Sequence, residues 1–216
     1  MIRLAILLSG RGSNFQAIHD AIAAGRLDAT IVCVISNVPE APGLARAREL
    51  GLSSHSIDQR AYSTRPAHEE EVLRVLAEAQ PDFICLAGYM RLLTPAFVAA
   101  YPSRILNIHP SLLPAFPGVN AQAQAVEYGA KVSGCTVHFV DQNLDAGPIL
   151  VQRTVEVRDD DTAESLAARI LEQEHIAYVD ALRKLSRGDY RIEGRRVLFG
   201  LTVNGARGEN GLPLHR

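Results

Sequence analysis

The sequence predicts an α/β protein with a doubly wound, mostly parallel, Rossmann-like sheet that ends in late antiparallel strands. Over residues 1–110, short apolar runs alternate with segments of helical periodicity, which is typical of a parallel sheet covered on both faces. A Gly-x-Gly turn joins the first apolar run to the first helical segment. After residue 130, two extended segments flank the six-residue loop DQNLDA, which predicts antiparallel neighbours.

The first half of the chain contains five predicted strands and four predicted helices. Continuous apolar runs mark the strands, Pro66 is tolerated in the first turn of the third helix, and Gly51 closes the second helix. Ser13 is the predicted N-cap of the first helix, and Gly25 is its predicted stop. The strands cover 2–8, 30–36, 53–57, 82–87 and 104–109, and the helices cover 13–25, 41–51, 65–79 and 94–101.

The second half contains two longer strands, at 131–140 and 147–157, and one long helix at 162–185. Three aspartates, 159–161, precede this helix, where negative charge suits the N-terminal end of the dipole. A short strand signal and a Gly-rich polar tail follow. We therefore expect a single domain over residues 1–190 and a short C-terminal strand with a polar tail over 191–216.

Composition limits the class of protein. Hydrophobic residues make up 47% of the 216 residues and the net charge is −2, without a basic patch, so we expect no binding to nucleic acid. No apolar run approaches the roughly 20 residues needed to span a bilayer, so we expect no membrane segment and a cytoplasmic location. The three cysteines, Cys33, Cys85 and Cys135, lie in separate strands and are interpreted as buried, reduced thiols.

The first loop, SGRGSN (9–14), predicts a phosphate site. Successive backbone N–H groups at a helix N-terminus attract anions, and glycines let the backbone approach the ligand. No Gly-Lys-Ser/Thr follows, which excludes a P-loop. Phe15 stands where a dinucleotide motif has its third glycine, and the second strand ends in Ser36-Asn37 without an acidic residue, so a single phosphate is favoured over NAD. A tight turn without a ligand is the alternative.

The stretch LNIHPSLLP (106–114) carries a polar pair in an apolar strand. Side chains two apart on a strand point to the same face, about 6.5 Å apart, so Asn107 and His109 lie together at the carboxyl end of the strand, where such sheets bind ligands. An amide can donate to a developing oxyanion and an imidazole can exchange a proton near neutral pH. No residue is placed as a nucleophile, which favours direct acyl transfer. The alternative for His109 is a core histidine bonded to backbone carbonyls.

Asp145, in LDAGP, is the candidate third member of this group. A carboxylate would orient the imidazole and favour its charged form. Asp-x-Gly is also a common turn sequence, so a purely structural role for Asp145 stays open.

Six segments in a fixed order resemble the phosphoribosylglycinamide formyltransferase family, whose members are folate-dependent enzymes of purine biosynthesis. The resemblance covers about residues 1–190 and implies a formyltransferase-type version of the predicted fold. The segments are SGRGSN (9–14), AGYMRLL (87–93), LNIHPSLLP (106–114), FPG (116–118), VHFVDQNLDAGPIL (137–150) and QEH (173–175).

The resemblance implies that the amine of glycinamide ribonucleotide attacks the formyl carbon of 10-formyltetrahydrofolate, the co-substrate, without a catalytic metal. Asn107 would stabilise the tetrahedral oxyanion, His109 would donate a proton, and Asp145 would support His109 and a proton-relaying water. The implied substrate-binding residues are Gly12, Ser13, Asn14 and Glu174 for the ribonucleotide, and Arg65, Met90, Arg91, Leu92, Leu93 and Asp141 for the folate. Both small molecules would bind a monomer or a homodimer.

Three alternatives remain. A formyltetrahydrofolate deformylase is expected to carry an additional N-terminal regulatory domain, whereas this chain starts at the first strand. A methionyl-tRNA formyltransferase is expected to carry a C-terminal RNA-binding domain and more positive charge. The alternative from another class is a non-catalytic nucleotide or folate sensor, which would bind its ligand without turnover.

One segment departs from the family. After FPG, family members often carry histidine or arginine, but here VNAQAQA has no charge, so help from this loop is in doubt. His138 alternates with apolar neighbours in a strand and is interpreted as a satisfied core residue.

Overall fold

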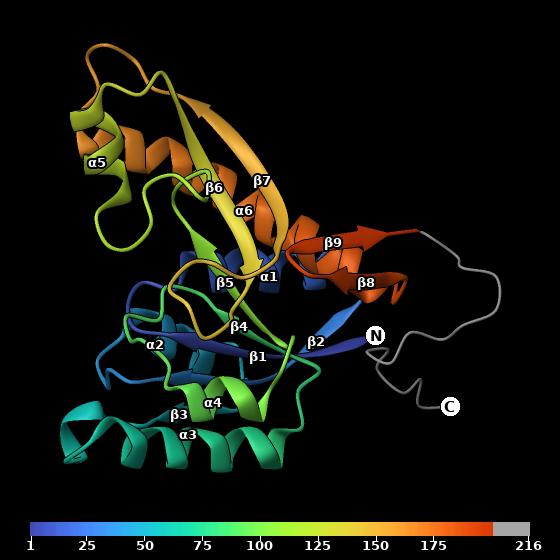
Figure 1. Ribbon diagram of the computed structural model, residues 1–216. Coiled ribbons are helices and arrows are strands. Elements are labelled where there is room, and N and C mark those ends of the chain that lie inside the picture. The colour runs from blue at the N-terminus through green and yellow to red at the C-terminus, as the bar shows by residue number, and fades with distance from the viewer. Residues whose placement is uncertain (201–216) are drawn as a thin grey trace.

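The structure is a computed structural model that describes residues 1–200, and it contains one nine-stranded mixed sheet (Figure 1). The strand order is β3-β2-β1-β4-β5-β6-β7-β9-β8, and neighbours are parallel from β3 to β5. The strands are β1 (Ile2–Leu8), β2 (Ala29–Ser36), β3 (Ser54–Ser56), β4 (Phe83–Leu86), β5 (Ile105–His109), β6 (Val132–Phe139), β7 (Ile149–Glu156), β8 (Tyr190–Glu193) and β9 (Arg196–Phe199). This architecture confirms the predicted fold class.

The helices cover both faces of the sheet. They are α1 (Ser13–Ala23), α2 (Pro42–Glu49), α3 (Arg65–Ala79), α4 (Pro95–Ala100), α5 (Ala121–Tyr128) and α6 (Ala163–Ser186), with one turn of 3₁₀-helix, η1 (Gln59–Ala61). Figure 1 shows α3 and α4 together at the bottom of the view, away from α1 and α6. Because β1 to β5 are parallel, their carboxyl ends lie at the same edge of the sheet.

Strand β1 shows how the two faces are filled. Leu4, Ile6 and Leu8 belong to the hydrophobic cluster that contains the apolar residues of α1 and α6. Ala5 and Leu7 belong to the second cluster, with the apolar residues of α3 and α4. All five are completely buried, which explains why the strand reads as a continuous apolar run.

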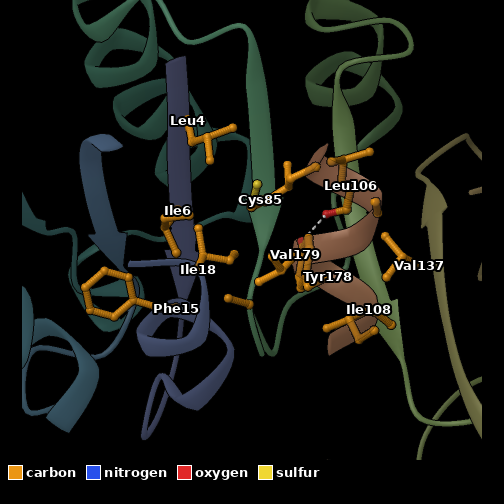
Figure 2. Close-up of a cluster of buried hydrophobic side chains, with 14 of the residues drawn as sticks. Leu4, Ile6, Phe15, Ile18, Cys85, Leu106, Ile108, Val137, Tyr178 and Val179 are labelled. Atoms are coloured by element: carbon orange, nitrogen blue, oxygen red, sulfur yellow. Dashed lines mark hydrogen bonds between the residues drawn. The ribbon is translucent and has the colours of Figure 1, made fainter. Parts of the chain in front are cut away.

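Helix α6 packs mainly against β6 and β7, and it reaches the parallel strands through one buried tyrosine. Its Tyr178 hydroxyl lies 3.1 Å from the carbonyl oxygens of both Leu86 and Leu106, and so joins the helix to β4 and β5. Figure 2 shows the hydrogen bond to Leu106. Thr162 is the N-cap of this helix and exchanges hydrogen bonds with Ser165 in a capping box. The Tyr178 contacts fix α6 to β5, the strand that carries Asn107 and His109, and to its neighbour β4.

The predicted antiparallel pairing of β6 with β7 is confirmed, and β5 with β6 and β8 with β9 are also antiparallel, whereas β9 runs parallel to β7. Helix α5 and strand β8 were not predicted, because AQAQAVEY has no clear apolar stripe and YRIE is short and polar. Gly12 is the N-cap of α1 and Ser13 is its first helical residue, so the predicted N-cap is wrong by one position.

The rest of the predicted tail, residues 201–216, lies outside the described residues. Within residues 1–200, no helix combines the length and the apolar character that crossing a bilayer requires.

Candidate active site

The predicted polar residues lie at the edge where the parallel strands end. Leu7 of β1 pairs with Leu86 of β4, which in turn pairs with Asn107 of β5. Strands in a sheet are about 4.8 Å apart, so the exit of β1 into the glycine turn is about 10 Å from Asn107. The predicted phosphate loop and the Asn–His pair therefore lie at one edge.

His109 is held by its neighbours on the chain. It is buried, and its Nε2 lies 2.8 Å from the carbonyl oxygen of Phe116 in the FPG turn. Since a carbonyl can only accept, Nε2 carries a proton. The other ring nitrogen, Nδ1, faces the carboxylate of Asp145 at 3.4 Å. The contact to Phe116 also shows that part of the alternative interpretation, a histidine bonded to backbone carbonyl groups, is correct.

Asp145 reaches His109 from the loop between β6 and β7. Its side chain is 9% exposed, and its Oδ2 accepts a hydrogen bond of 2.8 Å from the backbone N–H of Gly118. The backbone at Asp145 is left-handed, with φ of 49°, which aspartate tolerates better than most residues. Because the carboxylate faces two imidazoles and another loop, Asp145 is more than a turn residue.

Protonation of His109 would complete this arrangement. With a proton already on Nε2, a second proton on Nδ1 makes an imidazolium whose N–H points at the Asp145 carboxylate. Unlike charges at this distance, away from water, attract strongly. The arrangement is suited to an acid that delivers a proton and takes one back.

His138 is the residue that the sequence interpretation missed. It lies opposite Asn107 on β6, and its Nδ1 is 2.9 Å from the carbonyl oxygen of Phe139. Nδ1 therefore carries the proton, and the bare Nε2 lies 3.3 Å from Nδ2 of Asn107 and 3.8 Å from Oδ1 of Asp145. Burial lowers the pKa of His138, which keeps the ring neutral, so it accepts from the Asn107 amide and makes no ion pair with Asp145.

No sequence signal specified this contact. His138 alternates with apolar residues, and the register of β6 against β5 decides that it faces Asn107 rather than Leu106. The Asn107 amide is thereby oriented with one Nδ2 hydrogen toward His138.

The glycine turn ends at the N-terminus of α1. Gly12 is left-handed, with φ of 73°, and a Cβ placed on it would lie 2.9 Å from the Cα of Gly43 at the start of α2. Gly43 N–H donates to the carbonyl of Gly10 at 3.0 Å. Gly12 therefore allows two backbones to pack closely, a requirement that is separate from the predicted approach of a ligand.

Asn14 and Glu174 meet below this turn. The Asn14 amide donates to Oε2 of Glu174 at 2.8 Å, and the Oδ1 of Asn14 is buried and has no partner among residues 1–200. Burial raises the pKa of Glu174, and the Asn14 hydrogen bond opposes that shift. The structure thus brings together two predicted substrate residues that are 160 positions apart.

The predicted folate residues lie on two loops at the same edge. Met90, Leu92 and Leu144 present large exposed apolar side chains, as a surface that binds an aromatic ring would. Arg91 donates to Oε1 of Gln59 at 2.5 Å, and Leu93 packs against the second cluster. Asp141 accepts from the N–H of Asn143 at 2.8 Å and thereby shapes its own loop.

The side chain of Arg65 makes no contact that ties it to the other predicted folate residues. It begins α3, its side chain is exposed, and within residues 1–200 it makes no hydrogen bond or ion pair.

A groove of about 700 Å³ lies elsewhere, between α1 and α6. Ser13 is the only predicted site residue that lines it, and His175, Asp180 and Arg183 line its other wall. Asn107, His109 and Asp145 do not line this groove. Among residues 1–200, no three His, Cys, Asp or Glu side chains gather in a group that could hold a metal ion.

Comparisons with known proteins show which family the chain matches. The model of the formyl transferase family matches residues 2–182. Phosphoribosylglycinamide formyltransferase of Escherichia coli is 42% identical over 177 residues, which are 82% of this chain and 84% of that enzyme. The trifunctional purine biosynthetic protein adenosine-3 of Drosophila melanogaster is 47% identical over 188 residues, but the chain spans only 14% of its length.

Among solved structures, a transformylase is more similar in sequence to this chain than a deformylase is. Glycinamide ribonucleotide transformylase 1 from Symbiobacterium toebii is 49% identical, with a TM-score of 0.90 over 92% of this chain and 94% of that one. A formyltetrahydrofolate deformylase from Pseudomonas syringae is also similar, with a TM-score of 0.85, but it is 27% identical and only 65% of its chain is covered.

Proposed function

The chain belongs to the formyl transferase family, and on this premise we propose that it transfers the formyl group of 10-formyltetrahydrofolate to the amine of glycinamide ribonucleotide in purine biosynthesis. The observation that carries the proposal is the convergence of an amide, an imidazole and a carboxylate, with distances of 3.3 to 3.8 Å through His138 and His109, at the edge where the glycine turn also lies. The family match supplies the one-carbon chemistry.

The reaction needs two proton movements and one oxyanion. The amine nitrogen adds to the formyl carbon, and the carbonyl oxygen becomes an alkoxide, which Asn107 stabilises through its second Nδ2 hydrogen. His109 donates a proton toward this oxygen, and one of its two present contacts gives way to the substrate. The intermediate then collapses: the oxygen returns its proton to His109 as the carbonyl re-forms, the bond from carbon to N10 of the folate breaks, and N10 takes the proton that the amine loses. Asp145 stabilises the charged imidazole and a water that carries this proton.

We assign the two substrates to the two halves of the edge. The ribonucleotide phosphate binds the N–H groups at Gly12, Ser13 and Asn14, where the helix dipole favours an anion, and Glu174 contacts the same substrate. The folate ring binds between the loops at 90–93 and 141–145, and Arg65 approaches the charged tail of the folate. The exposed apolar side chains of both loops support this assignment.

We further propose that residues 1–190 act as one formyltransferase domain, as a monomer or homodimer, in the cytoplasm. The buried residues of the two hydrophobic clusters run from Ile2 to Leu185 on one continuous sheet, which supports a single folding unit. Three free, buried cysteines suit a reducing compartment.

The test is an assay that mixes the purified protein with glycinamide ribonucleotide and 10-formyltetrahydrofolate. Formylated ribonucleotide should appear with one tetrahydrofolate per turnover, and His109→Ala should lose most turnover while it still binds folate. Release of formate in the absence of the ribonucleotide would instead indicate a deformylase. Binding of both small molecules without any turnover would indicate a sensor.

A further inference from the structure

Asn37 occupies the position where a dinucleotide-binding sheet carries its ribose-binding acid, at the end of β2. It is 2% exposed, and both ends of its side-chain amide bond to protein groups. Oδ1 accepts from the Ser9 hydroxyl at 2.6 Å, and Nδ2 donates to Oε1 of Gln59 at 3.0 Å. An amide with both ends bonded inside the protein is not placed to hold a ribose, so its role must be sought in what it connects.

The first connection runs through Ser9. The Ser9 hydroxyl, which donates to Asn37, also accepts a hydrogen bond of 2.7 Å from the backbone N–H of Met90. The Ser9 N–H donates to the carbonyl of Gly88 at 3.0 Å. Ser9 is the residue that starts the glycine turn, so this connection joins the proposed phosphate loop to the proposed folate segment.

The second connection runs through Gln59. Its Oε1 accepts from both Asn37 and the Arg91 guanidinium, and its backbone N–H donates to the Asn37 carbonyl at 3.2 Å. Gln59 therefore joins η1 to the end of β2 and to the residue that follows Met90. One connection ends at Met90 and the other at Arg91, and both include the side chain of Asn37.

We propose that Asn37 is a positioning residue that holds the segment at 88–93 in a fixed place relative to the glycine turn, and so fixes the distance between the two substrate sites. The residue contacts no substrate. Its effect on kinetics rests on the proposed function, whereas its effect on the segment can be measured without any ligand. Loops that carry binding residues need such support from rigid elements if the reactants are to be held at reacting distance.

The expected kinetic effects follow from the two connections that meet at Asn37. Ser9→Ala removes one connection and Gln59→Ala the other, and each should raise the KM for the folate by about fivefold, the size of one lost hydrogen bond. Asn37→Ala removes both connections and should raise this KM by about twentyfold, with a much smaller change in the KM for the ribonucleotide. In a Ser9→Ala/Gln59→Ala background, the further change Asn37→Ala should add less than twofold.

Hydrogen–deuterium exchange gives the readout that needs no ligand. The Met90 amide and its neighbours at 88–93 should exchange at least fivefold faster in Asn37→Ala and in Ser9→Ala. Ser36→Ala is the matched control, because its hydroxyl bonds only to the N–H and carbonyl of Val38 and has no connection to this segment. It should lower stability without changing exchange at 88–93.

The outcomes separate the two hypotheses. If the native protein transfers no formyl group, the proposed function fails, and exchange alone decides the role of Asn37. If the native protein is active, wild-type exchange at 88–93 in Asn37→Ala, or an equal rise in both KM values, overturns the positioning role. If Asn37→Ala does not fold, Gln59→Ala, at a partly exposed residue, and Ser9→Ala each remove one connection and test the same positioning role.

Discussion

The charge of Asp145 can be tested without disturbing its loop. Asp145→Asn keeps the shape of the side chain. The new amide oxygen can accept the hydrogen bond from the Gly118 N–H that the carboxylate accepts in the native protein, so the loop should keep its place. The change removes the negative charge that lies 3.4 Å from Nδ1 of His109. At this distance and an effective dielectric constant of about 20, a carboxylate and an imidazolium attract by at most about 5 kcal/mol.

About 1.4 kcal/mol corresponds to a tenfold change in rate, so loss of the whole attraction would slow the reaction by about three orders of magnitude. The amide dipole that replaces the carboxylate retains part of it. We therefore expect kcat to fall by about 10²- to 10³-fold, which is also the range usual for loss of acid–base assistance.

The assay is formyl transfer to glycinamide ribonucleotide, with folate binding measured separately by calorimetry. Asp145→Asn should bind the folate with an affinity within about threefold of the native protein. Asp159→Asn is the charge-matched control, because Asp159 pairs on the surface with Lys131, which precedes β6 at the opposite end of that strand from His138. A kcat for Asp145→Asn within tenfold of the native value would show that its charge does not assist His109.

Three further predictions concern the scaffold. Gly12→Ala places a Cβ 2.9 Å from the backbone of Gly43, on a residue whose backbone is left-handed. We expect the free energy of unfolding, measured with urea, to fall by at least about 2 kcal/mol, and the affinity for the ribonucleotide to weaken. Native stability would contradict the close packing. The Arg169 guanidinium and a serine hydroxyl lower the pKa of Asp161, so its stabilising contribution is complete above the unfolded pKa of about 4 and is lost as the pH falls further. Urea midpoints measured from pH 5 to pH 2 should therefore drop less steeply in Asp161→Asn than in the native protein, and parallel curves would refute the pairing. Tyr178→Phe leaves two buried strand carbonyls without their hydroxyl donor and should cost about 1–3 kcal/mol in the same urea assay, whereas an unchanged midpoint would show that the hydroxyl adds nothing.

The sequence by itself determined the layers and the edge at which the site lies. The strand periodicity of two put Asn107 and His109 on one face, and the alternation of strands with helices required every parallel strand to end at one edge. Continuous apolar strands predicted a sheet buried on both faces, and the two hydrophobic clusters fill those faces. These features follow from local patterns, because hydrophobic periodicity records which face of an element is buried.

The tertiary structure decided which side chains meet. Periodicity does not specify register, and a shift of one residue between β5 and β6 would turn His138 away from Asn107. The path of the 141–146 loop brings Asp145, and not Asp141, to His109, since Gly147 packs against the Phe139 carbonyl at the base of the loop. The hydrogen bonds of Asn37 likewise depend on the packing of segments far apart in the chain. Such contacts depend on long-range packing, in which each partner satisfies polar groups that the local sequence leaves open.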